Sequence, residues 1–339
     1  MKNVNIGIVG LGRLGRRHAL NLLASVPGAV LVAAASPVAE ERQWGSENLT
    51  GAAIYASLGE LLKHDGLDAV WLVTPTSLHV EQIEESLLAG KHVFCEKPLS
   101  LTLAECDRVL ALAEQRPDQM VMIGFTRRFD AAYMALKQRI DAGELGQVYR
   151  VHFESHDPID PHGFFVKFAP TSGGLFLDCG IHDVDLARWL ANGARAVRVS
   201  ASGSNQQYPG LAECGDIDTG VGTIEFDNGL IATLFISRTS HRGYEATLWA
   251  SGTEGGALAG KGIAAPAITV EQGNRVAQQG LPDFFARFSD AFLVEAKAFV
   301  DAIRQGAPSP LTLADAREAT RIAIALREAY EGHCVIELG

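Results

Sequence analysis

Gly10-Leu11-Gly12-Arg13-Leu14-Gly15 is the stretch that decides the fold of this chain. It has the spacing G-x-G-x-x-G and lies between an apolar strand, Ile6–Val9, and a helix predicted to run to about Ser25. In such a turn the first glycine permits the tight bend, the second lets the backbone approach a pyrophosphate, and the third allows close helix–strand packing. The pattern predicts dinucleotide binding, with these cofactor contacts: Gly10, Gly12, Arg13 and Leu14.

Short apolar strands alternate with amphipathic helices through the rest of the first third. Two of the helices have capping boxes, Ser57 with Glu60 and Thr102 with Glu105. Near-continuous apolar strands separated by helices imply a parallel sheet that is covered on both faces. We therefore expect a Rossmann dinucleotide-binding domain over residues 1–124. Its further strands are expected at Ala29–Ala35, Ala52–Tyr55, Ala69–Val73, His92–Cys95 and Met120–Phe125.

A different pattern begins after Phe125 and predicts a second α/β domain, residues 125–339, with a large open, mostly antiparallel sheet. Asp227-Asn228-Gly229 between two strand-like segments is a tight hairpin signal. The last helix, about residues 312–331, is a candidate to pack back on the first domain, which would make that domain discontinuous. The expected helices are about 130–142, 283–304 and 312–331, and the expected strands are Val148–Ser155, Val197–Ser202, Thr219–Phe226, Leu230–Ser237 and Ala246–Ala250.

Bulk properties narrow the class of protein. A length of 339 residues favours two domains. The formal net charge of −11 and the pI of about 5.4 argue against nucleic acid or an anionic membrane as partner. The 5 cysteines form no C-x-x-C pair, which is typical of reduced thiols. No export signal and no apolar run of ~20 residues is found, so a cytoplasmic protein that acts on a small molecule is expected.

The residue expected to contact the adenosine ribose is unusual. About 20 residues after the glycine turn, an NAD site usually presents Asp or Glu. Here the chain reads Ala34-Ala35-Ser36-Pro37-Val38, so Ser36 occupies that place. Serine can neither make the same two-point contact nor repel a 2′-phosphate. Yet no Arg or Lys that could bind a 2′-phosphate follows directly, and the first cation after Ser36 is Arg42. The sequence favours NAD, with NADP or dual use left open.

Two segments carry residues suited to alcohol oxidation. Lys97, in Glu96-Lys97-Pro98 at the carboxyl end of a strand, could hydrogen-bond a substrate hydroxyl or transfer a proton; alternatively it is a surface lysine before a turn. In Asp178–Asp185, a helix would place Asp178, His182 and Asp185 on one face. His182 would then take a proton from the alcohol while Asp178 holds the imidazole. A capped helix with a structural histidine is the alternative.

Three further residue groups are weaker candidates. His152 and His156 share a strand face, but metal binding would need more ligands nearby, and no metal is expected. His156 or its neighbour Asp157 is a better candidate for a pocket wall. Arg127 could bind hydroxyls, or Arg127 and Arg128 could be a solvated pair.

Taken together, the chain resembles the glucose–fructose oxidoreductase/inositol dehydrogenase (Gfo/Idh/MocA) family, and within it the bacterial inositol 2-dehydrogenases most closely. The resemblance extends over nearly the whole chain. It rests on Gly10–Gly15, Phe94–Leu99, Gly124–Asp130, Asp178–Asp185 and Arg242–Glu245.

The resemblance implies roles for individual residues. The catalytic residues would be Lys97, Asp178 and His182. Substrate-pocket positions would be Arg127, Asp157, Asp185 and Tyr244. Cofactor-contacting positions would be Thr74, Pro75, Thr76, His79 and Glu96, with Lys97 beside them. It also implies a homo-oligomer, a dimer or tetramer, formed through the large sheet.

The implied reaction is the NAD-dependent oxidation of a ring secondary alcohol of myo- or scyllo-inositol to the ketone, in carbohydrate catabolism. A dehydrogenase of a pyranose, an aldose or anhydrosugar, would use the same three catalytic residues. A sugar-responsive regulator that binds the cofactor is the alternative of another class. The proline- and glycine-containing stretch Asp157–Thr171 is expected to be a substrate loop of its own, so the epimer or sugar stays open, as do reaction direction, pathway and oligomer size.

Overall fold

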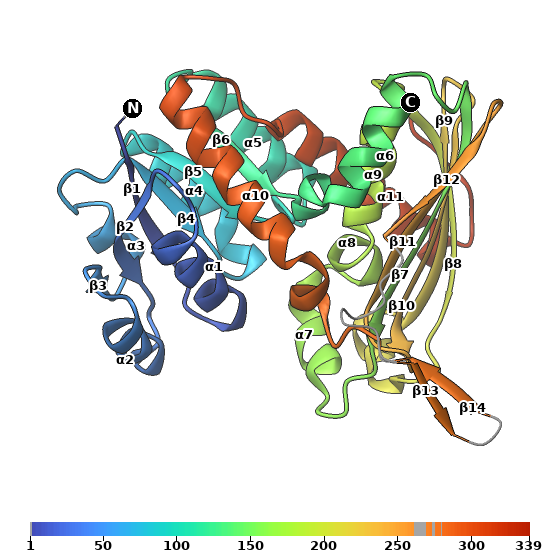
Figure 1. Ribbon diagram of the computed structural model, residues 1–339, viewed down its shortest axis with the longest axis horizontal. Coiled ribbons are helices and arrows are strands. Elements are labelled where there is room, and N and C mark those ends of the chain that lie inside the picture. Colours follow the sequence, from blue (N-terminus) through green and yellow to red (C-terminus); the bar gives the residue numbers. More distant parts are fainter. Residues whose placement is uncertain (1, 261–268, 273–274, 279) are drawn as a thin grey trace. The chain divides into compact units, whose positions relative to one another are not determined.

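The computed structural model describes residues 2–260, 269–272, 275–278 and 280–339 (Figure 1). The chain divides into two compact units, and each takes its residues from two parts of the sequence. The first unit is Met1–Thr126 with Asp290–Thr320, and the second is Arg127–Ser289 with Arg321–Gly339. Within the described part of the chain, no helix combines the length and the apolar character needed to cross a bilayer.

The first unit is built on a six-stranded sheet in the order β3-β2-β1-β4-β5-β6, and all its strand pairs are parallel. The strand order reverses between β1 and β4, which is where doubly wound sheets bind their ligands. Every residue of β4 and β6 is buried, so both faces are covered. The predicted Rossmann sheet is thus confirmed. Its strands are β1 (Val4–Val9), β2 (Ala29–Ala35), β3 (Ala53–Tyr55), β4 (Ala69–Leu72), β5 (His92–Glu96) and β6 (Val121–Gly124).

Helices connect these strands, and the hydroxyl contact of each predicted capping box forms at the start of its helix. The Ser57 hydroxyl accepts from Glu60 N at 3.3 Å, and the Thr102 hydroxyl accepts from Glu105 N at 3.4 Å. Each contact satisfies a backbone donor that has no partner within its helix. The connecting elements are α1 (Arg13–Ala24), α2 (Ala39–Asn48), α3 (Leu58–Leu61), η1 (Thr76–Leu78), α4 (His79–Leu88) and α5 (Leu103–Glu114).

An aromatic cluster fixes a late helix to this sheet. The rings of Trp71 and Phe94, on neighbouring strands, stack with centroids 3.6 Å apart. Phe299 of α10 (Phe284–Gln305) packs edge-on against both, with centroids at 5.5 and 5.9 Å. Burying one such side chain contributes about 1.5–3 kcal/mol. Both α10 and α11 (Leu313–Gly332) run from one unit into the other, because the unit boundaries fall within them.

The second unit is built on a seven-stranded sheet in the order β12-β11-β7-β10-β9-β8-β15. Only β7 and β10 pair in parallel, so the predicted mostly antiparallel sheet is confirmed. The predicted hairpin joins β9 to β10, with Gly229 at φ +84° and its N–H donating to Phe226 O. The strands are β7 (Val148–Pro158), β8 (Ala196–Ser204), β9 (Thr219–Phe226), β10 (Ile231–Ser240), β11 (Glu245–Gly252), β12 (Gly256–Ala259) and β15 (Ile336–Glu337).

Helices of the second unit lie on one side of this sheet (Figure 1). In β10, Ala232, Leu234 and Ile236 are buried, whereas Ile231 and Phe235 on the opposite face are exposed. This alternation gives the sheet one covered face and one open face. The other elements of the unit are η2 (Thr126–Phe129), α6 (Ala131–Asp141), α7 (Phe164–Ser172), α8 (Leu175–Asp178), α9 (Ile181–Leu190), η3 (Pro209–Cys214) and the hairpin strands β13 (Thr269–Gln272) and β14 (Arg275–Gln278).

One buried carboxyl group of the first unit has an unusual environment. Glu295 of α10 is 0% exposed and lies near the Thr126 hydroxyl and the Glu96 carboxylate. Burial, and then the nearby charge of Glu96, raise the pKa of Glu295 well above its ordinary value of 4.5. Folding therefore favours the protonated form. Keeping the Glu295 carboxyl group protonated lowers the free energy of unfolding only above its ordinary pKa, and more so as the pH rises. The reason is that this group then ionises in the unfolded chain but not in the folded chain.

Glu295→Gln should remove this pH-dependent cost, because the amide is similar in shape and does not ionise. The gain in unfolding free energy over the wild type should be larger near pH 8 than near pH 5. Measuring the Tm of wild type and variant at both pH values checks this difference. Glu213→Gln, at an exposed position, is the control. An equal effect of Glu295→Gln at both pH values would contradict the protonated state.

Candidate active site

The glycine turn between β1 and α1 has the geometry of a dinucleotide cradle. Gly10 has φ +92°, and a Cβ there would lie 2.2 Å from Val73 O. A Cβ at Gly15 would lie 1.9 Å from Gly10 O. Both positions therefore require glycine for the protein's own packing. At Gly12 a Cβ would have no neighbour closer than a Glu41 oxygen at 3.5 Å. The missing side chain of Gly12 leaves space for a ligand, as a pyrophosphate at this turn requires.

The loops after β4 and β5 hold most of the other predicted cofactor residues. The buried imidazole of His79 bridges them, with Nδ1 2.7 Å from Pro98 O and Nε2 3.0 Å from Thr74 O. The Thr74 hydroxyl donates to Gln82 at 2.6 Å. His79 therefore fastens two loops at the carboxyl edge of the sheet, and Pro75 and Thr76 follow Thr74 in the first of them.

Glu96 and Lys97 lie at the end of β5. The Glu96 carboxylate is buried and pairs with His18 Nε2 at 2.9 Å, while its other oxygen accepts from Lys97 N at 3.2 Å. These contacts fix the backbone that carries Lys97, which belongs to the first unit. The other two residues predicted to be catalytic, Asp178 and His182, belong to the second unit.

The segment that carries Asp178 and His182 departs from the predicted single helix. It forms two short helices, α8 and α9, with Cys179 and Gly180 between them. A Cβ at Gly180 would lie 2.6 Å from the Ile236 side chain and 2.8 Å from Phe176 O. Close packing against β10 therefore explains the glycine at the break. Asp178 is the last residue of α8, and His182 is the second residue of α9.

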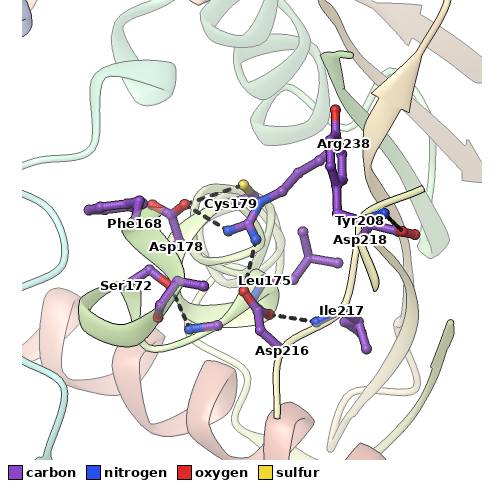
Figure 2. A network of polar contacts seen from close by, with 12 residues as sticks. Phe168, Ser172, Leu175, Asp178, Cys179, Tyr208, Asp216, Ile217, Asp218 and Arg238 are labelled. Atoms are coloured by element: carbon purple, nitrogen blue, oxygen red, sulfur yellow. Dashed lines mark hydrogen bonds and ion pairs between the residues drawn. The ribbon is translucent and has the colours of Figure 1, made fainter. Parts of the chain in front are cut away.

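A buried arginine holds Asp178 in place. Arg238 of β10 is 0% exposed and donates to Asp178 Oδ2 at 3.1 Å and to Asp216 Oδ2 at 2.8 Å (Figure 2). The second oxygen of Asp216 accepts from Leu175 N at 2.7 Å and from Ile217 N at 2.8 Å. Because Leu175 begins α8 and Asp178 ends it, this network fixes both ends of the short helix. The sequence did not reveal Arg238 or Asp216.

Two further groups lie beside Asp178. The Cys179 Sγ is 3.7 Å from Asp178 Oδ2 and 3.5 Å from Asp157 Oδ2. Burial, followed by the nearby Asp178 charge, raises the pKa of Asp157. The structure therefore brings Asp157, a predicted pocket residue, close to the predicted catalytic carboxylate.

Arg127 and Arg128 form buried ion pairs with α9, so the solvated-pair alternative is wrong. Arg127 NH1 pairs with Asp183 and donates to the Ser155 hydroxyl at 2.9 Å. Arg128 makes a two-point contact with Asp185, at 2.8 and 2.6 Å. Asp183, which the sequence did not single out, is thus a main partner of Arg127.

Tyr244 joins the Arg127 network. Its hydroxyl oxygen accepts from Arg127 NH2 at 3.2 Å. Burial raises the pKa of Tyr244 to about 12, so the phenol stays protonated. Since its oxygen accepts from arginine, the phenolic proton can be donated to another group.

The strand histidines lie on the other face of β7 from Ser155. His156 Nδ1 is 3.2 Å from the Ser237 hydroxyl, and the ring packs edge-on against Phe235. His152 Nδ1 is 2.7 Å from the Thr233 hydroxyl. The structure therefore does not group His156 with Asp157.

Comparisons with known proteins agree with this architecture. Residues 4–125 match the family described as "Oxidoreductase family, NAD-binding Rossmann fold", and residues 133–258 match the GFO/IDH/MocA C-terminal domain. Scyllo-inositol 2-dehydrogenase (NAD(+)) of Bacillus subtilis (strain 168) is 35% identical, with 99% of this chain and 96% of that protein covered. Myo-inositol 2-dehydrogenase of Thermotoga maritima is 33% identical, with 97% and 96% covered.

A solved structure is similar over its whole length. It is scyllo-inositol dehydrogenase from Lactobacillus casei with bound NAD(H) and scyllo-inositol, with a TM-score of 0.94 and 35% identity over 99% of both chains. The glycine cradle of the first unit is the part of this chain that fits NAD. The chain therefore belongs to the GFO/IDH/MocA family of oxidoreductases, with an NAD-binding Rossmann domain and the family's C-terminal domain.

Proposed function

We propose that this protein oxidises a ring secondary alcohol of an inositol, myo- or scyllo-inositol, to the ketone with NAD. The observation that supports this most directly is the buried Arg238, which holds the Asp178 carboxylate at the end of α8, four residues before His182. The relatives of similar length named above are inositol dehydrogenases. Bound NAD supplies the acceptor of the hydride.

His182 is the proposed base. Oxidation of a secondary alcohol releases a hydride from carbon and a proton from oxygen, and an imidazole is suited to accept that proton near neutral pH. Asp178 would orient this imidazole and stabilise its charged form. Lys97 would hydrogen-bond the reacting oxygen. These roles follow from the family resemblance. The fixed position of Asp178 supports its proposed role of orienting the imidazole.

The proposed substrate contacts are Arg127, Asp157, Asp185 and Tyr244. Arg127 and Asp185 already take part in buried ion pairs, which would hold them rigid for a polyol. The phenolic proton of Tyr244 supplies a donor, and the Asp157 carboxyl group an acceptor, that can meet ring hydroxyls. His156 is not among the proposed contacts, because its side chain lies on the opposite face of β7 from Ser155, against Phe235.

The open face of the large sheet is the proposed surface for assembly into a homo-oligomer. Exposed apolar side chains lie on this face in four strands: Val221, Ile231, Phe235, Trp249 and Leu258. Register places Trp249 opposite Leu258, on neighbouring strands. On this face they form two groups, Val221 with Ile231 and Phe235, and Trp249 with Leu258, separated by β7. Exposed apolar side chains gathered on one sheet face are typical of an interface.

Absorbance of reduced nicotinamide, followed with a panel of inositols and aldoses, tests the function. Turnover of myo- or scyllo-inositol with NAD is expected. Turnover of pyranoses alone would move the enzyme to the sugar branch of the family. Tight dinucleotide binding without any turnover would contradict the enzymatic proposal.

His182→Ala should lower kcat by about 10²–10⁴-fold and leave the Kd for NAD unchanged, because the base acts on the alcohol.

Arg238 should act as a positioning residue. Arg238→Met leaves the buried Asp216 without its cation and should cost about 3–5 kcal/mol of unfolding free energy. Arg238→Lys keeps the charge and should preserve the fold, with kcat lowered and the Kd for NAD unchanged. Arg195→Met, which removes the exposed Arg195–Asp227 pair, is the matched control. Wild-type kcat in a folded Arg238→Met variant would exclude this role.

Trp249→Asp should shift the protein to a smaller species, because a charge on the open sheet face opposes burial there. Light scattering after gel filtration measures the mass of wild type and variant. Leu88→Asp, at an exposed position of α4 in the first unit, is the control. A monomeric wild type would refute assembly.

A further inference from the structure

Glu41, a residue of α2, lies beside the position at the end of β2 where NAD sites usually have an acidic residue and this sequence has none. The ribose-reading position after β2 holds Ser36, whose hydroxyl donates to Glu41 Oε2 at 2.6 Å. The backbone N–H of Leu11, inside the glycine turn, donates to the same oxygen at 3.2 Å. The carboxylate of Glu41 is thus held between the end of β2 and the cofactor turn.

The other Glu41 oxygen faces the ligand side of this turn. Oε1 is the atom nearest to the place that a Cβ of Gly12 would take, at 3.5 Å. Gly12 is the glycine whose missing side chain leaves space for the dinucleotide. One oxygen is therefore fixed by two protein donors, and the other lies beside the cofactor's path.

Two nearby cations, Arg42 and Arg16, are directed at backbone carbonyls. Arg42 NH1 donates to Ser36 O at 2.9 Å, and Arg16 Nε donates to Leu11 O at 3.0 Å. Arg16 also lies over the Trp44 ring, 4.9 Å from its centroid. These contacts hold the Ser36 turn and the glycine turn in shape around a negative charge, which disfavours a phosphate at the same place.

We propose that Glu41 performs the task of the acidic residue missing at position 36. Its carboxylate accepts hydrogen bonds from the adenosine ribose hydroxyls of NAD and repels the 2′-phosphate of NADP. Ser36 acts through Glu41, by anchoring the carboxylate. This inference concerns the dinucleotide alone and holds whichever alcohol the enzyme oxidises.

Binding of NADH and NADPH to the protein without substrate tests the proposal, measured as Kd by cofactor fluorescence. Glu41→Gln keeps the shape and removes the charge. The Kd for NADH should rise roughly 10-fold or more, because a hydrogen bond to a charged group is lost. The Kd for NADPH should fall, so that the preference for NADH shrinks or disappears. Glu40→Gln, at the exposed neighbouring position, should change neither value.

A second substitution separates a specific role from general damage. Ser36→Asp in the Glu41→Gln background places a carboxylate at the usual position and should restore tight binding of NADH over NADPH. If Glu41→Gln binds NADH as tightly as the wild type, or more tightly, the carboxylate fills the ribose position only when the cofactor is absent, and the proposal fails. A wild-type protein that prefers NADPH would overturn it as well.

Discussion

A buried guanidinium needs carboxylate partners, since removing an unpaired charge from water costs several kcal/mol. In the second unit this requirement is met three times along one segment. Arg238, Arg127 and Arg128 pair respectively with Asp178, Asp183 and Asp185, all within α8 and α9. Each pair ties the helical segment that carries His182 to another element, β10 or η2. The position of the proposed base therefore depends on these buried ion pairs.

The cofactor turn of the first unit depends on close backbone packing. Gly10 and Gly15 are required because their missing side chains let β1, α1 and the loop after β4 approach closely. Gly12 is different, because its free space faces a ligand. The same turn fixes Glu41 through Leu11 N, so cofactor cradle and proposed ribose contact form one structure.

Local patterns predicted most of the fold. The glycine spacing, the alternation of apolar strands with helices, the Ser57 and Thr102 helix caps and the Asp227-Asn228-Gly229 hairpin all act over a few residues and are visible in the sequence. The partners of Arg238 are 22 and 60 residues away, and no periodicity indicates such pairs. Glu41 was missed because only the folded turn after Ser36 brings its carboxylate to the glycine loop. The break between α8 and α9 depends on the approach of Ile236 to Gly180, which is equally non-local.

The transfer of hydrogen from the alcohol carbon to the cofactor is the central claim, and an isotope label tests it directly. Inositol carrying deuterium on the oxidised carbon is turned over with NAD, and the reduced cofactor is examined by NMR. The account predicts that the deuterium is recovered on the nicotinamide ring, together with a slower rate for the labelled alcohol when hydride transfer limits turnover. Loss of the deuterium to solvent, with none on the cofactor, would contradict it.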